Sequence, residues 1–170
     1  MGFLKKGKKT AVSVQTQGDW APVLPVAAGE RGLYRALREQ VPIIDAAIFK
    51  LVRLVGGFRA LCPDRRAEAA LARFLQTVPV NGMNRGADSF ISTYFEQLLT
   101  YGNAVGEIVV ADGEIRALYN AALEDLEIRL VSPLESGVFV VRSTGTEPCR
   151  YPELILSSAL NPPPGSARGT

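Results

Sequence analysis

Apolar residues recur at three- and four-residue steps along the first half of the chain, a pattern that indicates amphipathic helices. The first such pattern begins near Glu30 and ends at Gly56-Gly57, a C-terminal glycine signal. Pro42 interrupts it, so either one long helix kinks there or a second helix starts with proline in its first turn. We expect a break or a kink. The stripe expected to face the core consists of Leu33, Leu37, Val41, Ile44, Ile48, Leu51 and Val55.

Two further helices are expected before the period of the pattern changes. One opens at Pro63-Asp64 and runs to about Leu75, after a short extended piece at 58–61. Its predicted buried face consists of Ala67, Ala70, Leu71, Phe74 and Leu75. A loop marked by Pro79, Gly82 and Gly86 leads to the next helix, which Asp88 or Ser89 can cap. The apolar face of that helix consists of Phe90, Ile91, Tyr94, Phe95, Leu98 and Leu99.

The pattern becomes strand-like after Gly102-Asn103, which ends the last helix. Residues 105–110 and 114–119 form two strands joined by Asp112-Gly113, a strong two-residue hairpin signal. Further strands are expected at 125–130, 137–142 and 154–160, with Thr144-Gly145 in one of the turns. This order predicts an α+β fold in which N-terminal helices precede a mainly antiparallel β region.

The chain divides into an arm and one domain. Residues 1–29 have no helical period and read as a flexible basic N-terminal arm that becomes ordered near Trp20 to Val23. Residues 30–170 form the α+β domain. Its proline-rich end, residues 161–170, follows a strand-like run and resembles a connection to a further element, so we expect the domain to continue past Thr170.

The composition limits the classes of function. A hydrophobic content of 47% supports a real core, and a net charge of +2 is too small for a whole-domain nucleic-acid binder. The basic charge is local, at Lys5, Lys6, Lys8 and Lys9. These lysines form either a solvated terminus or an arm that touches nucleic acid or anionic lipid.

The residues offer little for catalysis. The absence of histidine removes Ser-His-Asp and Cys-His nucleophile systems and the usual zinc sites. Cys62 and Cys149 form no CxxC motif, so reduced thiols are expected. Glu124, Asp125 and Glu127 could suggest metal or acid–base chemistry, but alternate strand residues point to opposite faces, which favours a solvated edge. We expect no enzyme, cofactor or metal site.

Four segments, taken in order, resemble tailed-bacteriophage portal proteins. They are the helical run 33–48, the helix that ends in Gly102-Asn103 and passes straight into a hairpin (95–109), the returning strand 113–119 and the connection 159–169. The similarity covers about residues 34–170. Portal proteins are usually several hundred residues long, so the chain resembles their N-terminal wing region.

The resemblance implies a structural, non-enzymatic subunit of a ring, commonly of twelve copies, at one capsid vertex of a virion or prophage particle. Such a head–tail connector contacts the capsid protein and conducts double-stranded DNA. It docks the terminase during packaging and the head–tail adaptor afterwards, and it assembles in the host cytoplasm. It implies no membrane and no cofactor, and it makes the four N-terminal lysines candidate contacts for non-specific DNA binding.

Two alternatives remain open from the residues. The chain could be a stand-alone small α+β domain that binds a ligand or peptide, which predicts a closed pocket. It could be an enzyme that uses the three carboxylates, which requires them to converge in a cleft. The portal hypothesis instead predicts exposed apolar patches that neighbouring subunits would cover.

Overall fold

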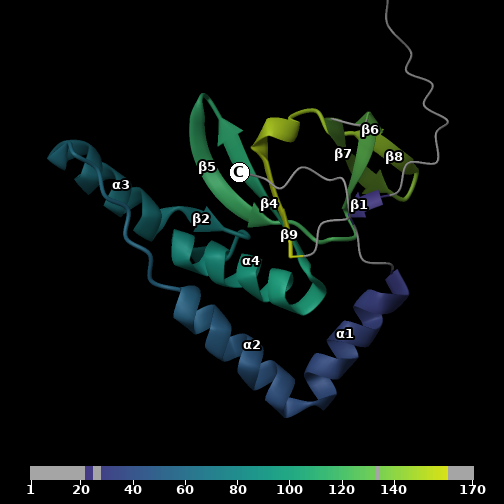
Figure 1. Cartoon of the computed structure of the whole chain (residues 1–170). Helices are drawn as coiled ribbons and strands as arrows, with labels where there is room; N and C mark the ends of the chain where they lie inside the picture. The colour runs from purple at the N-terminus through teal and green to yellow at the C-terminus, as the bar shows by residue number, and fades with distance from the viewer. Residues whose placement is uncertain (1–21, 25–27, 133–134, 161–170) are drawn as a thin grey trace, which may run out of the picture.

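A computed structural model describes residues 22–24, 28–132 and 135–160 and confirms the predicted α+β class (Figure 1). Helices α1 (Ala28–Gln40) and α2 (Pro42–Val55) form a V below α4 (Ala87–Tyr101), which lies against one face of a sheet. Helix α3 (Arg65–Thr77) projects to one side of this body.

Two sheets follow the helices. The first has the order β3-β2-β5-β4-β9, antiparallel except for the parallel pair β2–β5, and comprises β2 (Pro79–Val80), β3 (Asn84–Arg85), β4 (Asn103–Ala111), β5 (Glu114–Asn120) and β9 (Ile155–Ala159). The second is antiparallel with the order β1-β6-β7-β8, and comprises β1 (Pro22–Leu24), β6 (Leu126–Ser132), β7 (Glu135–Arg142) and β8 (Gly145–Pro148). A 3-10 turn, η1 (Pro152–Leu154), precedes β9.

The break at Pro42 is confirmed, and so are the ends of the neighbouring helices. Val41 has an extended backbone (φ −117°, ψ 90°), and Pro42 occupies the first position of α2, where it sacrifices no helical hydrogen bond. Helix α2 ends at Gly56. Asp64 caps α3, because its carboxylate accepts hydrogen bonds from the backbone N–H of Arg66 at 2.8 Å and of Ala67 at 3.4 Å.

The predicted cap of α4 is wrong. Neither Asp88 nor Ser89 caps the helix; Gly86 takes that position with φ 89°, a left-handed conformation suited to glycine. Its N–H donates to the Val78 carbonyl at 2.8 Å, and a side chain there would meet the Gln76 carbonyl oxygen at 3.2 Å. The predicted loop marked by Pro79, Gly82 and Gly86 thus contains the tight β2–β3 hairpin. The extended piece predicted at 58–61 forms no strand.

The five predicted strands are present as β4, β5, β6, β7 and β9, and the Asp112-Gly113 hairpin is confirmed. Both turn residues have left-handed backbones, with φ 56° and 75°. Strands β1, β2, β3 and β8 were not predicted. Strand β1 lies inside the predicted flexible arm, where Leu24 pairs with Ile128 of β6, and α1 already begins at Ala28. The rest of that arm and the proline-rich end lie outside the described residues.

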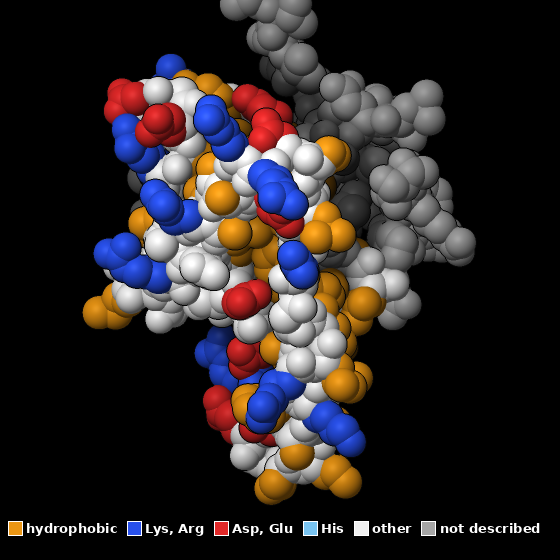
Figure 2. Space-filling model, turned by 90° about the vertical axis from the view of Figure 1, so that its left-hand side faces the viewer, with side chains coloured by type: hydrophobic (Ala, Val, Ile, Leu, Met, Phe, Trp, Pro, Cys, Tyr) orange, Lys and Arg blue, Asp and Glu red, His pale blue; other side chains and the backbone are white. Residues whose placement is uncertain are grey.

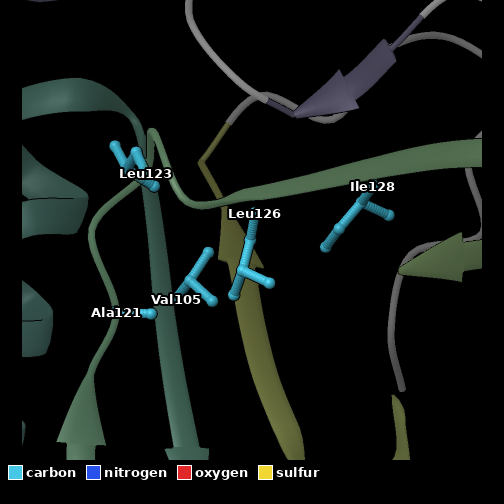
Figure 3. Packing of buried hydrophobic residues seen from close by; sticks show 5 residues of the cluster. All are labelled: Val105, Ala121, Leu123, Leu126 and Ile128. Atoms are coloured by element: carbon cyan, nitrogen blue, oxygen red, sulfur yellow. The ribbon is translucent and has the colours of Figure 1, made fainter. Parts of the chain in front are cut away.

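One buried cluster joins the two sheets. It consists of Val105, Ala121, Leu123, Leu126 and Ile128 (Figure 3). Helix α4 covers the other face of the first sheet with Ala87, Phe90 and Leu98. Gly106 of β4 lies directly beneath the Phe90 ring, so it permits the close approach of helix and sheet.

Polar contacts between α4 and the sheet supplement this apolar packing. The Gln97 side chain donates to the Ala121 carbonyl at 2.8 Å and accepts from the Val105 N–H at 2.9 Å. The Tyr94 hydroxyl and Ser158 Oγ lie 2.9 Å apart. Burial raises the pKa of Tyr94 above its ordinary value of 10.0, and the Ser158 contact offsets part of that rise. These contacts determine where α4, and hence α2 below it, lies relative to the sheet.

Candidate assembly surfaces

Helix α2 carries two apolar stripes on neighbouring sides. Ile44, Ile48 and Val52 lie on the side towards α4, and Ile48 is buried. A second apolar stripe at helical spacing lies about 100° further around the helix, and we call it the α2 outer face: Ile43, Ala47, Leu51 and Leu54. Ile43 is 76% exposed and Leu54 72% exposed. Apolar helix surfaces are normally buried against another element, and these exposures show that the α2 outer face has no such partner within the described residues.

The predicted core stripe through α1 and α2 is wrong for most of its members. Leu33, Leu37, Leu51 and Val55 are all exposed, whereas Ile48 is buried. The break at Pro42 changes the direction of the chain, so the α1 and α2 parts of the stripe no longer share one side. Figure 2 shows apolar side chains among Lys and Arg at the lower end of the molecule, where α1 and α2 meet.

The predicted buried face of α3 is wrong at Ala67 and Ala70, which are exposed. Its other members, Leu71, Phe74 and Leu75, are half-buried, and none of the helix's residues is fully buried. Helix α3 projects from the body, and no second layer packs against its far side in the part of the chain that the structure describes. Amphipathic spacing alone therefore predicted the helix correctly but not its burial.

A second exposed apolar surface lies on the β4–β5 hairpin. We call it the hairpin outer face: Val109, Val110, Ile115 and Tyr119, which are 36–46% exposed. The cross-strand pairs Glu107–Tyr119 and Val110–Ile115 place their side chains on one side of the sheet, and a register shift between Val109 and Val110 lets both neighbours share it. This side faces away from α4, because Gly106 of the opposite parity meets Phe90.

The helical and sheet halves of the chain carry net charges of opposite sign. Residues 28–86 carry ten Lys and Arg against five Asp and Glu, a net charge of +5. Residues 87–160 carry four against eleven, a net charge of −7. Lys50 lies within the α2 outer face, whereas Glu107 lies beside Tyr119 on the hairpin outer face. The near-neutral total charge therefore hides a strong division between helical and sheet regions.

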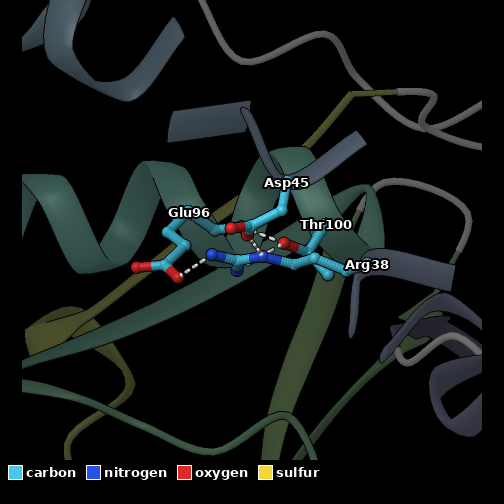
Figure 4. Close-up of polar contacts among 4 residues, drawn as sticks. All are labelled: Arg38, Asp45, Glu96 and Thr100. Atoms are coloured by element: carbon cyan, nitrogen blue, oxygen red, sulfur yellow. Dashed lines mark hydrogen bonds and ion pairs between the residues drawn. The ribbon is translucent and has the colours of Figure 1, made fainter. Parts of the chain in front are cut away.

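An ionic junction holds α1, α2 and α4 together (Figure 4). Arg38 of α1 contacts Asp45 of α2 at 2.6 Å, and Glu96 and Thr100 of α4 at 2.5 and 3.2 Å. Burial lowers the pKa of Arg38, but the hydrogen bonds and charges of Asp45 and Glu96 outweigh it and raise the pKa above its usual value. The permanently charged guanidinium thus fixes the angle at which α2 presents its outer face.

A groove lies at the same corner. It measures about 600 Å³ and is lined by Arg35, Arg38, Glu39, Asp45, Phe49 and Tyr101, among others. Its charged lining differs from the mainly apolar lining of a typical small-molecule site. Because Arg38 is already engaged by two carboxylates, the groove resembles a helix junction more than a preformed ligand site.

The residues singled out for catalysis do not converge. Glu124 pairs with Arg31 at 3.8 Å, Glu127 pairs with Arg129, and the Asp125 carbonyl accepts from the Val141 N–H at 2.8 Å. Within the described part of the chain, no three Cys, Asp or Glu residues are grouped closely enough to hold a metal. In the same ranges Cys62 and Cys149 are unbonded thiols, and no helix has the length and apolarity to cross a membrane.

The candidate DNA contacts Lys5, Lys6, Lys8 and Lys9 lie outside the described residues. The two apolar outer faces are the surfaces that residue-by-residue reasoning missed. The α2 outer face was visible in the sequence as a second stripe at the spacing 43, 47, 51 and 54. The hairpin outer face depends on the register shift in β4, for which the sequence carries no local signal.

Comparison with known proteins identifies no relative: no protein-family model matches the chain, and no curated protein has a significantly similar sequence.

Proposed function

We propose that the chain is a structural subunit of a phage portal, the head–tail connector ring through which double-stranded DNA is packaged and ejected. The resemblance of the four sequence segments motivates the proposal. The fold is compatible with it at the most characteristic segment: Gly102 ends α4 in a left-handed conformation (φ 72°), and Asn103 starts β4 without an intervening loop. In this proposal the ring contacts the capsid protein, the terminase and the head–tail adaptor, and the chain catalyses no reaction.

The observation that carries the proposal is the exposure of the α2 outer face. Burying one Leu or Ile side chain stabilises an assembly by roughly 1.5–3 kcal/mol. Ile43, Leu51 and Leu54 are 47–76% exposed in the isolated chain, so contact with another subunit would bury them and provide much of this stabilisation. Contiguous exposed apolar residues of this kind mark interaction surfaces, and a ring subunit requires such surfaces towards its neighbours.

Localisation in particles tests this function directly. An antibody against the chain is applied, with immunogold detection, to particles assembled from the genome that encodes it. Labelling at a single vertex, where the tail attaches, is the expected result. Unlabelled particles, or labelling spread over the whole capsid, would overturn the proposal. Mass spectrometry of the same purified particles provides a second readout that does not depend on epitope exposure.

A small domain that binds a ligand or peptide is the second candidate, because the groove beside Arg38 falls within the usual size range of ligand sites. It predicts that a carboxylate-bearing ligand competes with Asp45 and Glu96 for the arginines of the groove. Thermal-shift screening with dicarboxylates and acidic peptides, with Arg35→Ala as the control variant, distinguishes this candidate from a portal subunit. A shift that Arg35→Ala abolishes would favour it.

A further inference from the structure

The two apolar outer faces belong to the two outer layers of a stack of three. Helix α4 contacts β4 and β5 on one side and α2 on the other, so the layers follow the order α2, α4, sheet (Figure 1). The α2 outer face lies on an exposed side of α2, and the hairpin outer face lies on the side of the sheet away from α4. Because α4 lies between these two layers, one molecule cannot bring its two faces together, but two molecules can.

The charges of the two faces are complementary. The α2 outer face includes Lys50 and belongs to the half of the chain with a net charge of +5, whereas the hairpin outer face adjoins Glu107 and belongs to the half with −7. Asp112 and Glu114 add acidic groups at the hairpin tip, although Arg116 pairs with both. Packing α2 on α2, or hairpin on hairpin, would oppose like charges.

The two faces also match in length. Eleven residues separate Ile43 and Leu54, which corresponds to about 17 Å along a helix at 1.5 Å per residue. Ile115 and Tyr119 lie four residues apart, which corresponds to roughly 13 Å along a strand. A helix laid across the outer side of this hairpin would thus cover most of both apolar faces.

We propose that the chain self-associates head to tail, with the α2 outer face of one copy packed on the hairpin outer face of the next. The contact is heterologous, so every open assembly retains one free face of each kind, and copies can be added until the arrangement closes. The inference names the contact surfaces of the proposed portal subunit and rests on that function only for closure into a ring. The apolar residues provide most of the binding energy, and Lys50 and Glu107 favour the mixed pairing over the symmetric ones.

Two single substitutions, one in each face, test the proposal. Leu54→Arg introduces a charge into the α2 outer face, and Ile115→Arg does so on the hairpin outer face; Met83→Arg, at a 96% exposed position outside both faces, is the matched control. Analytical ultracentrifugation of the whole chain measures the assembly. We expect wild type and Met83→Arg to form oligomers that grow with concentration, and each of the other two variants to be monomeric.

The mixture of the two monomeric variants provides the decisive result. Leu54→Arg retains an intact hairpin face and Ile115→Arg an intact α2 face, so the mixture is expected to form a 1:1 dimer and nothing larger. That dimer would also show that both variants are folded. Two monomeric variants that remain monomeric when mixed would overturn the proposal, and so would a monomeric wild type.

Other outcomes separate this inference from the proposed function. If Ile115→Arg associates as wild type does while Leu54→Arg is monomeric, the contact is a symmetric α2–α2 one. If both variants associate as wild type does, the contact lies elsewhere. Either result would overturn head-to-tail docking, even where particles are labelled at one vertex. Conversely, a 1:1 dimer from the mixture together with unlabelled particles would support the docking surfaces and overturn the portal function.

Discussion

Adding one methyl group to Gly106 should destabilise the protein, because the glycine lies beneath the Phe90 ring. A Cβ atom at Gly106 would lie 2.5 Å from Phe90 Cζ and 2.9 Å from Cε2. Carbon atoms in favourable contact are about 3.5–4.0 Å apart, so the ring has to move by roughly 1 Å. Phe90 is only 6% exposed and its ring centroid lies 5.8 Å from that of Tyr94, so the ring has little free space to move into.

The expected magnitude combines two opposing effects. Overpacking of a filled core typically costs about 1–3 kcal/mol. Replacing glycine by alanine reduces the conformational entropy of the unfolded chain, which stabilises the folded state by roughly 0.5–1 kcal/mol. We therefore expect Gly106→Ala to lower the free energy of unfolding by about 0.5–2 kcal/mol. Gly32→Ala is the matched control: it adds the same atom to helix α1 with nothing within 4 Å, and should stabilise slightly.

Urea denaturation followed by far-ultraviolet circular dichroism measures both variants against wild type. In a domain of this size, each kcal/mol of destabilisation corresponds to a decrease in Tm of roughly 2–4 °C. Phe90→Leu makes room for the added methyl group, so it should cost less in the Gly106→Ala background than alone, with a coupling energy of about 0.5–3 kcal/mol. A Gly106→Ala protein as stable as wild type, or the absence of any coupling, would refute the reasoning.

Three further predictions concern the contacts of α4 and α3. Gln97→Leu should cost about 1–3 kcal/mol in urea denaturation, because the buried Val105 N–H loses its acceptor and the Ala121 carbonyl loses its donor; an unchanged free energy of unfolding would contradict this. Because the pKa of Tyr94 is raised in the folded state, its contribution to stability is complete below pH 10 and is lost as the pH rises further. Above pH 10 the Tm of wild type should therefore fall more steeply with pH than that of Tyr94→Phe, and equal slopes would contradict this. Asp64→Ala should lower the free energy of opening of α3, measured by amide hydrogen exchange, by about 0.5–2 kcal/mol because it removes the helix cap. Asp88→Ala removes no cap and should have little effect on α4, so equal effects of the two substitutions would refute the assigned caps.

Local signals explain the elements that the sequence predicted correctly. Pro42 cannot continue a helix without losing a hydrogen bond, and Asp112-Gly113 readily adopts the two left-handed conformations of a tight hairpin. Both effects act within a few residues, so they remain valid whatever surrounds them. The predicted α+β order followed from such signals together with the change of hydrophobic period.

Short strands and caps were missed because partners distant in the sequence create them. Strand β1 exists through its pairing with β6, about a hundred residues later. Gly86 replaces Asp88 as the cap of α4 because it also closes the β2–β3 hairpin, where its backbone conformation excludes other residues. A three-residue segment or a single glycine carries too little sequence pattern to reveal such a role.

The sequence alone determined the helices, the five longer strands and the breaks between them, since propensity, proline and glycine act locally. Only the tertiary structure decided which apolar stripes are covered. Helix α2 carries two stripes of similar character, and the position of α4, held by Arg38, buries Ile48 and leaves Leu54 in solvent. Burial depends on which element lies opposite, which is a property of the packed chain and not of the helix. For the same reason, the candidate assembly surfaces became visible only when the layers were in place.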